Sequence, residues 1–548
     1  RLAEVYPIGG AADRLKLRDA RTSESLPAAK LLFGGRELLE GLIRDVQGRE
    51  YLHYKLYGKQ VVVPVVMMVS EARRGQLHIE KLCERLGWFG RPRSSITLIK
   101  QPSVPTVGEM GEWHLSSPLT LKMRPGGHGA VWKLLAGSGR LTSLTEEGKS
   151  FLLLRQINNP IAGLDHGLLA FAGAGIHNKK AFGFASCPRA VSSHEGMNVV
   201  KVSGNTMCLS NIEYCDFAAS GIQDTPYEEG ASTSKFPSNT NILFAEITSV
   251  KEKIERSPFP GLVLNFRSHA KQPIARLESL MQNIADTFVE QYQPPLSVDR
   301  QLDMPTYVTF NERHKTISAV KRKYTGDGNL LETPEGCYYD LLTNMHDLLT
   351  TYCGIDVPPL PTPGDFVEHG PTFMCHYHPA LGPLFSIIGK KLSGGRLAQG
   401  AELSLEIAEC AIESLDLEGS LIIHAENVMG HVEEGTIRYS ERAGTCRLSR
   451  VCVRNRGVDW NGTSSDFWRH GHSRKEALSI RIEGSGEFIA EDVTFSGSHT
   501  LVVPDGMRMR AVQDGEGIAL TTEPIQDKKP LWRYTIGQES AILVDPAT

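Results

Sequence analysis

The first 330 residues alternate between short apolar runs and longer amphipathic stretches. The apolar runs predict strands at residues 5–8, 61–69, 96–99, 151–157, 242–247 and 262–266. The amphipathic stretches predict helices at residues 37–46, 72–86, 165–173 and 275–289. Apolar strands separated by helices are typical of a mainly parallel sheet with helices on both faces. We therefore expect an α/β domain with a mixed, mainly parallel sheet, whose ligands bind beyond the carboxyl ends of the strands.

Beyond residue 370 the apolar positions alternate with a period of two. Leu403 and Leu405 are predicted to point one way while Ser404 and Glu406 point the other, and similar runs recur as far as residue 495. This pattern favours a β-rich module, either a β-helix or another solenoid. Because no strict hexapeptide repeat is visible, a β-sandwich is the alternative.

A proline-rich segment at residues 357–364 separates the two patterns and predicts a stiff, extended connection. The sequence therefore predicts three parts. They are an α/β domain at residues 1–340, a connection at 341–370 and a β-rich domain at 371–548.

Composition narrows the class of protein. The chain has 548 residues, 41% of them hydrophobic, and a net charge of −4, which disfavours a general nucleic-acid binder. No apolar run is long enough to span a membrane, so membrane insertion is not expected. Ten cysteines without a Cys-x-x-Cys pair indicate free thiols. The run at residues 375–378, Cys-His-Tyr-His, fits no common zinc spacing and indicates a packed or surface cluster.

Candidate chemistry begins at the end of the first predicted strand. Gly9, Gly10 and Ala11 form a loop of small residues there, and Lys30 follows 19 residues after Ala11. Small residues allow the backbone to approach a bulky anion, and a lysine adds a positive charge for phosphate oxygens. The loop is therefore a candidate phosphate site, although a strand followed by two glycines is common.

Other polar or glycine-rich segments follow predicted strands farther along the chain. Gln101-Pro102 could read the edge of a base, and residues 126–129, Gly-Gly-His-Gly, could place an imidazole against a ligand. Residues 156–159 end a strand with three carboxamides, and Asn241 comes just before another strand. Each segment taken singly is also an ordinary turn. For Arg276 and Glu278 a structural ion pair is favoured.

In this order the segments resemble the motifs of the UDP-sugar pyrophosphorylases, the uridylyltransferase family that includes eukaryotic UDP-glucose pyrophosphorylase. The resemblance covers residues 4 to 330, and Lys321 matches the late lysine of the family pattern. It implies a Rossmann-like nucleotidyltransferase fold and the reaction of UTP with glucose 1-phosphate to give UDP-glucose and pyrophosphate. Plastid members, whose product feeds sulfolipid synthesis, also have a β-rich tail. This narrower resemblance implies a location in the chloroplast stroma, although a targeting peptide is not visible in a sequence that begins at Arg1.

The resemblance also implies a role for each site residue. Lys30 and Lys321 are expected to be catalytic, because they would neutralise phosphate charge during the transfer. The residues expected to bind UTP are Gly9, Gly10, Ala11, Gln101, Gly127 and Asn158. Those expected to bind the sugar phosphate are His128, Gln156, Glu213 and Asn241.

The chain departs from the family pattern at two places. Asn158 stands where the family usually has an aspartate that helps to hold Mg²⁺, and a neutral amide is a weaker ligand for a hard cation. Mg²⁺ is still the expected cofactor, with Asn158 or Asp165 as its protein ligand. The second departure is residues 11–13, Ala-Ala-Asp, where the family has Leu-Gly-Thr.

Three other functions stay open. The chain could be a pyrophosphorylase for another sugar 1-phosphate, or a catalytically altered nucleotide-sugar-binding or scaffold protein, for which Asn158 is the best support. A dinucleotide-dependent oxidoreductase could use Gly9 and Gly10, but the third glycine of Gly-x-Gly-x-x-Gly is missing. The oligomeric state is not predicted.

Overall fold

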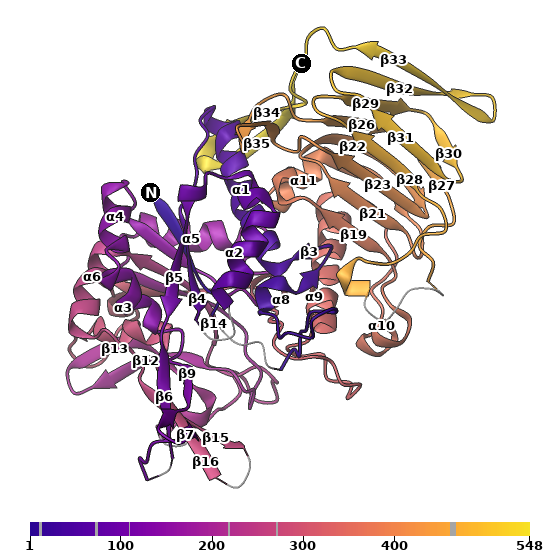
Figure 1. Cartoon of the computed structure of the whole chain (residues 1–548). Helices are drawn as coiled ribbons and strands as arrows, with labels where there is room; N and C mark the ends of the chain where they lie inside the picture. The colour runs from indigo at the N-terminus through magenta and orange to yellow at the C-terminus, as the bar shows by residue number, and fades with distance from the viewer. Residues whose placement is uncertain are drawn as a thin grey trace.

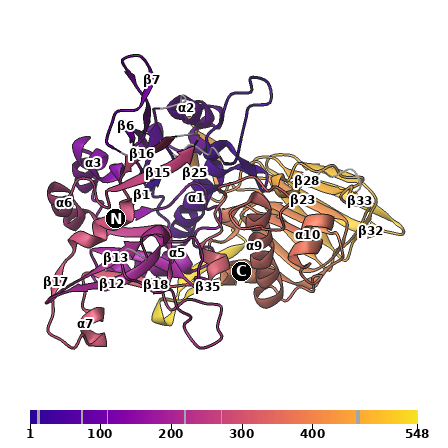
Figure 2. The ribbon, with the colours of Figure 1, turned by 90° about the horizontal axis from the view of Figure 1, so that it is seen from below.

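The computed structural model describes residues 1–9, 14–71, 75–108, 110–217, 220–269, 272–460 and 467–547. An α/β unit and a stack of parallel strands lie side by side, and helix α1 (Leu38–Tyr57) lies where they meet (Figure 1). The view from below shows the same arrangement, with α9 (Pro334–Asp347) also near the junction (Figure 2). No helix among the described residues has both the length and the apolar character needed to cross a bilayer.

A ten-stranded mixed sheet forms the centre of the α/β unit. One half is parallel and contains β10 (Phe151–Leu154), β1 (Leu2–Pro7), β4 (Val65–Ser70) and β5 (Ile96–Gln101). The other half is largely antiparallel and contains β11 (Phe182–Cys187), β12 (Met197–Ser203), β13 (Thr206–Ile212) and β14 (Ser238–Glu246). The prediction of a mixed sheet in an α/β domain is confirmed.

Both faces of the sheet are buried along β1, β4 and β10, as the uniformly apolar strands predicted. Val5 packs into a core with helices α3 (Ala130–Gly137), α4 (Arg140–Glu146) and α6 (Ile247–Arg256). Its neighbour Tyr6 points to the other face, into a core shared with α1, α2 (Gly75–Arg85) and the parallel-strand stack. Alternate side chains of one strand therefore belong to different cores.

The helix predicted at residues 275–289 is wrong. Residues Gln272–Glu278 form strand β16, which pairs with β15 (Val263–His269) on one side and β6 (Ser103–Gly108) on the other. In this register Ala275 lies beside Val107 of β6 and Leu277 lies beside Leu264 of β15. Pairing on both edges thus overrides the local helical pattern, and only a 3₁₀ segment, η6 (Met281–Thr287), is helical.

The C-terminal module is a parallel β-solenoid, so the β-sandwich alternative is wrong. One ladder joins β19 (Met374–Tyr377), β21 (Glu402–Glu406), β23 (Ser420–Ala425), β28 (Leu478–Ile482) and β31 (His499–Val503), all parallel. Leu403 lies beside Leu421, 18 residues or three hexapeptides later. Leu421 in turn lies beside Leu478, which is 57 residues later. The hairpin of β24 (Gly430–Glu433) and β25 (Thr436–Tyr439) lies within the longer interval. Such insertions interrupt the repeat along the sequence.

The segment between the two predicted domains contains more helix than a proline-rich connection suggests. It holds the end of α9, a π-helical turn (Leu348–Tyr352), an extended stretch at residues 353–362 and α10 (Pro363–His369). Leu342, Leu348 and Phe366 are buried in the core that also contains solenoid residues. The segment is therefore packed between the two modules along much of its length.

A buried network of ion pairs joins the sheet to α1. Arg155, which follows β10, contacts Glu4 of β1 at 2.7 Å and Asp45 of α1 at 2.5 Å, and Arg49 also pairs with both carboxylates. Burial alone raises the pKa of Glu4, but the two guanidinium groups hold it below its usual value. The network therefore stays fully charged and fixes α1 against two parallel strands.

The same helix contacts the solenoid through its C-terminal half. The Tyr51 hydroxyl donates to Glu409 at 2.9 Å, and Lys55 lies 3.3 Å from Glu441. The hydroxyl of Tyr439, in the inserted hairpin, donates to Glu50 of α1 at 3.1 Å. Helix α1 thus carries polar contacts to both modules.

We expect Arg155→Met to destabilise the protein by roughly 3–5 kcal/mol, because it leaves the buried Glu4 and the half-buried Asp45 with one cation fewer. Urea unfolding monitored by circular dichroism measures the loss. Arg256→Ala is the control, since it removes an exposed pair with Glu252 and should change stability by less than about 1 kcal/mol. Equal effects of the two substitutions would contradict the role assigned to the network.

Candidate functional site

A cavity of about 770 Å³ opens at the carboxyl ends of the parallel strands. Gly9 after β1, Ser70 at the end of β4 and Gln101 at the end of β5 all line it. The antiparallel sheet of β6, β9 (Met123–Pro125), β15 and β16 contributes further lining residues. Its position beyond the strand ends is the one expected for a ligand site in an α/β sheet, and its size suits a small ligand.

Three residues of the predicted UTP site meet in this cleft. The side chain of Gln101 is buried, and its amide nitrogen donates to the carbonyl of Gly127 at 2.6 Å. A Cβ on Gly9 would lie 2.5 Å from the amide oxygen of Gln101. Only a hydrogen fits there, so the backbone of the first glycine loop lies directly against the side chain of Gln101. Because that side chain also bonds Gly127, it joins the two glycine loops.

The Gly-Gly-His-Gly loop is held by backbone contacts to the end of β16. The amide of Ser279 donates to Gly126, and the amide of Gly129 donates to Ser279. Gly127 has a φ of 87°, and a Cβ there would collide with the backbone of Ser279. The glycines are thus required both by conformation and by the close approach of another strand.

His128 lines the cleft as a neutral donor. Its Nδ1 accepts a hydrogen bond from the backbone amide of Met281 at 3.1 Å, so the proton of the neutral ring is on Nε2. Burial lowers its pKa to about 4. At neutral pH the ring can therefore donate one hydrogen bond to a ligand but contributes no charge.

The turn after β10 positions the late lysine. The backbone amide of Val320 donates to the carbonyl of Asn158, and the side chain of Asn159 bonds the backbone of Thr316 and Ser318. These bonds bring Lys321 to the cleft, where its ammonium lies 2.5 Å from Glu332. Residues from two distant parts of the sequence therefore share one wall.

The cleft is strongly basic. Among the described lining residues the only carboxylate belongs to Glu278, and it is paired with Arg276, as the sequence predicted. The basic residues of the lining are Arg14, Lys16, Lys122, Arg124, Arg276 and Lys321. An excess of cations in a concave site favours a ligand with several negative charges.

Sequence reasoning missed four of these cations. Arg14 and Lys16 directly follow the first glycine loop, so their place in the chain was a usable signal. Lys122 and Arg124 come from a hairpin whose contact with the cleft depends on tertiary structure. No local motif marks the second pair.

The metal prediction has little support from the described side chains. Asp165 does not line the cleft, since one of its oxygens accepts from the backbone amide of Phe385 and the other lies 3.0 Å from His166. Asn158 does line the cleft, but only the paired Glu278 offers a carboxylate among the described lining residues. This part of the cleft therefore does not fit a protein-held Mg²⁺ site, and the cofactor stays a prediction.

The remaining predicted residues are divided among several places. Seven of the predicted residues line the cleft: Gly9, Gln101, Gly127, His128, Gln156, Asn158 and Lys321. Gly10 and Ala11 lie outside the described residues. Lys30 ends a 3₁₀ turn and is not among the lining residues, although Pro27 and Ala28 are. Asn241 lies at an irregularity of β14 with a φ of 58° and bonds Asn239. This arrangement does not test the predicted role of Asn241 in binding the sugar phosphate.

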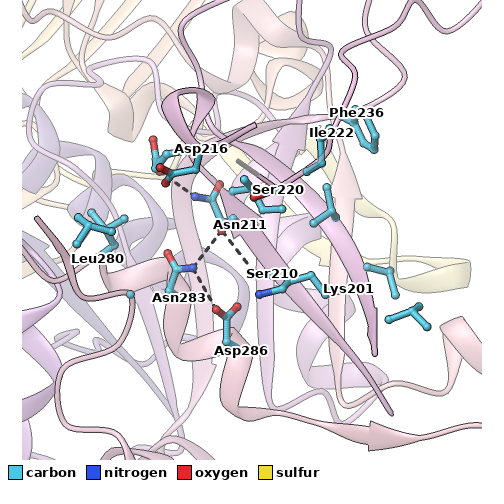
Figure 3. A pocket seen from close by; sticks show the side chains of 17 residues that line it. Lys201, Ser210, Asn211, Asp216, Ser220, Ile222, Phe236, Leu280, Asn283 and Asp286 are labelled. Atoms are coloured by element: carbon cyan, nitrogen blue, oxygen red, sulfur yellow. Dashed lines mark hydrogen bonds between the residues drawn. The ribbon is translucent and has the colours of Figure 1, made fainter. Parts of the chain in front are cut away.

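A second cavity of about 580 Å³ lies beside β12 and β13, and Asn211 and Asn283 are among its lining residues (Figure 3). Glu213 also lines it. Its carboxylate accepts from the side chains of Asn211 at 2.8 Å and Gln282 at 3.0 Å. Gln282 directly follows Met281, the partner of His128. One short 3₁₀ segment therefore connects the two cavities.

The chain matches known protein families over two separate stretches. Residues 44–306 match the family model described as UTP–glucose-1-phosphate uridylyltransferase. These residues form a domain of the UTP–glucose-1-phosphate uridylyltransferase family. Residues 392–546 match the model described as UGP3-like, C-terminal hexapeptide repeats, so the solenoid is built from hexapeptides that are too irregular to recognise by inspection.

Two curated relatives extend the match beyond this uridylyltransferase domain. UTP–glucose-1-phosphate uridylyltransferase 3, chloroplastic, of Arabidopsis thaliana is 39% identical over 96% of this chain, which spans 62% of that protein. UDP-sugar pyrophosphorylase of Oryza sativa subsp. japonica is 24% identical over 82% of this chain and 75% of that protein.

A solved structure supports the fold of the uridylyltransferase domain. The uridine diphosphate N-acetylglucosamine pyrophosphorylase of Trypanosoma brucei, in complex with an inhibitor, superposes with a TM-score of 0.55 at 18% identity. The match covers 71% of this chain and 74% of that one. The predicted nucleotidyltransferase fold is thereby confirmed.

We expect Gly127→Ala to weaken nucleotide binding, because the new methyl group would push the loop away from Ser279 and break the bond from Gln101. Titration calorimetry with UTP should show a loss of at least about tenfold, equivalent to about 1.4 kcal/mol. Gly137→Ala, at a position with open space around it, is the control and should bind normally. Unchanged binding by both variants would contradict this account of the loop.

We expect the ring of His128 to titrate near pH 4 rather than near its unperturbed value of about 6.5. Proton NMR across pH 3–8 measures this, with the His128→Gln spectrum assigning the signal. Because the folded pKa is depressed, the unfolded state binds more protons below about pH 6.5, and this group's contribution to stability falls as the pH drops from there towards 4. A midpoint above pH 6 would show that the ring is solvated instead.

Proposed function

We propose that the protein is a uridylyltransferase that makes UDP-glucose and pyrophosphate from UTP and glucose 1-phosphate. The observation that carries the proposal is the basic cleft, which joins the two glycine loops, Gln101 and Lys321 at the carboxyl ends of the strands. The family of residues 44–306 and the names of the relatives support the same chemistry.

In this proposal the nucleotide lies along the glycine loops. The backbone of Gly9 and Gly127 and the side chain of Gln101 lie against one another in the lining and suit the flat uracil and its ribose. The triphosphate then extends towards the cations contributed by residues 14–16 and 122–124. Neutralised phosphates make the α-phosphorus more accessible to an anionic nucleophile.

The sugar phosphate supplies its own nucleophile. Its phosphate oxygen attacks the α-phosphorus of UTP in line, a P–O bond to the sugar phosphate forms, and the bond to pyrophosphate breaks. Because the attacking oxygen is already ionised, the protein needs no general base. The work of the site is alignment and charge stabilisation.

Lys321 is the described residue best placed to stabilise charge during the transfer. Its ammonium pairs with Glu332, which also lies 3.6 Å from Arg14. An arriving phosphate can replace this carboxylate as the partner of Lys321. His128 and Gln156 offer uncharged hydrogen bonds beside it, and the resemblance adds Lys30, Glu213 and Asn241.

The finer assignments rest on resemblance and on the chloroplastic relative. We propose a plastid location and a supply of UDP-glucose for sulfolipid synthesis. Mg²⁺ is part of the proposal, but no step is assigned to it, because the described cleft residues do not form a carboxylate site for it.

A second candidate is a pyrophosphorylase with a different or broader sugar preference. The relative named UDP-sugar pyrophosphorylase favours it, since it matches 82% of this chain. Sugar 1-phosphates that differ by one hydroxyl group or an acetamide can be distinguished by pocket shape. Pyrophosphate release with UTP and a panel of sugar 1-phosphates separates the two candidates.

We expect Lys321→Ala to lower kcat by about 10²–10³-fold while the KM for UTP changes much less, because charge stabilisation in the transition state is lost. Coupled detection of pyrophosphate with the full chain gives both constants. Lys59→Ala, which changes an exposed lysine beyond the end of α1, is the control and should match the wild type. UTP binding without turnover of any sugar 1-phosphate would favour the binding-protein alternative and overturn the proposal.

A further inference from the structure

A second group of polar side chains lies outside the cleft, near the start of the solenoid. Glu402 starts strand β21, and His470 and His472 come from the loop that follows the 3₁₀ turn at Phe467–Arg469. One potential ligand atom from each of the three residues lies within 4.8 Å of the other two. The cluster is separate from every residue assigned to nucleotide or sugar-phosphate binding.

The distances within the cluster suit a tetrahedral metal ion. The Nε2 atoms of His472 and His470 lie 2.9 Å and 3.7 Å from the same carboxylate oxygen of Glu402. Zinc lies about 2.0–2.2 Å from nitrogen and carboxylate ligands, so tetrahedral ligand atoms are about 3.4 Å apart. The two observed distances lie on either side of this value, and all three ligand atoms lie within 4.8 Å of one another, so small side-chain adjustments would bring them to the distances that zinc needs.

Burial also favours an ion in this cluster. The side chains of Glu402 and His472 are fully buried, and that of His470 is 16% exposed. Among the described residues the Nδ1 atoms of both rings have no hydrogen-bond partner, but these atoms lie on the other side of each ring from the Nε2 atoms that face Glu402. A buried water can bond Nδ1 without competing for the ion.

Neighbouring residues hold the candidate ligands in place. Arg474 donates two hydrogen bonds of 2.6 Å to Glu402, which keep the carboxylate ionised and oriented. The ring of His376 packs against His470 with centroids 4.2 Å apart, and its Nε2 lies 3.0 Å from the Tyr338 hydroxyl. These outer contacts restrict the orientation of two of the three candidate ligands.

We propose that Glu402, His470 and His472 bind a divalent transition metal, with zinc as the expected ion. Two imidazoles and one carboxylate are a ligand set that zinc accepts, and three protein ligands leave the fourth position for water. The Cys-His-Tyr-His run at residues 375–378 supplies no ligand, and His376 only supports the ring of His470.

The location indicates what the ion would do for the fold. The backbone amides of Gly34 and Gly35, in the turn between β2 (Leu32–Phe33) and β3 (Arg36–Glu37), donate to the carbonyls of Trp468 and Arg469. The loop that carries both histidines thus touches the α/β unit as well as β21. A bound ion would join this loop to the solenoid and stabilise the junction of the two modules.

The test uses the full chain purified after expression with zinc in the medium. Mass spectrometry of the metal content should give about one zinc per chain, and His470→Ala and His472→Gln should lower zinc affinity by more than about 100-fold. Replacement by Co²⁺ should give the visible absorption of a tetrahedral site in the wild type and in neither variant. Chelation should lower the Tm of the wild type more than that of the variants.

His424→Ala is the matched control, because it changes an exposed solenoid histidine outside the cluster, and it should keep one zinc per chain. Circular dichroism establishes that all variants are folded. Less than about 0.1 zinc per chain in the wild type, together with no cobalt spectrum, would overturn the proposal. With that result, Glu402, His472 and Arg474 would form a buried ion cluster without a metal. Equal metal loss in the control would overturn the choice of ligands.

Discussion

The buried pairing of Arg155 with Glu4 and Asp45 is the interaction on which the arrangement of the molecule depends. Charges in the interior are tolerated only when each has a partner, so β1, β10 and α1 have one satisfactory relative placement. The first glycine loop leaves β1 a few residues after Glu4, and the asparagine turn begins just after Arg155. The network beneath the sheet therefore also fixes the origins of two walls of the cleft.

Helix α1 extends this constraint to the other module. Asp45 and Arg49, in the middle of the helix, belong to the ion network, and its C-terminal half contacts Glu409 and the inserted hairpin of the solenoid. The core between the modules is continuous, since buried residues of β1, α9 and the solenoid ladders belong to it. A solenoid packed this way is part of the structural support of the uridylyltransferase domain, and the proposed metal cluster lies at the same junction.

The cleft shows how glycine-rich segments of low individual value form one site. Gly127 and Gly129 pack against Ser279, and the same stretch of chain supplies the amide that fixes the tautomer of His128. Gln282, one residue beyond that amide, reaches Glu213 in the second cavity. A segment predicted as an amphipathic helix is thus a strand and a 3₁₀ turn, and the change matters because the segment connects the two cavities.

The sequence alone determined the class of each module and the principal residues of the cleft. Apolar strands followed by glycine or amide turns predicted a sheet with a ligand site at its carboxyl edge, and the period-two pattern predicted a β-rich tail. These features are local, so they can be read from neighbouring residues.

Tertiary structure decided what local pattern does not encode. The strand at residues 272–278 depends on pairing at both edges, and Lys122 and Arg124 reach the cleft from a separate hairpin. Asp165 contacts α11 (Phe385–Lys391) instead of the cleft, and the cluster of Glu402, His470 and His472 joins residues about 70 positions apart, because folding brings together groups that no sequence spacing relates.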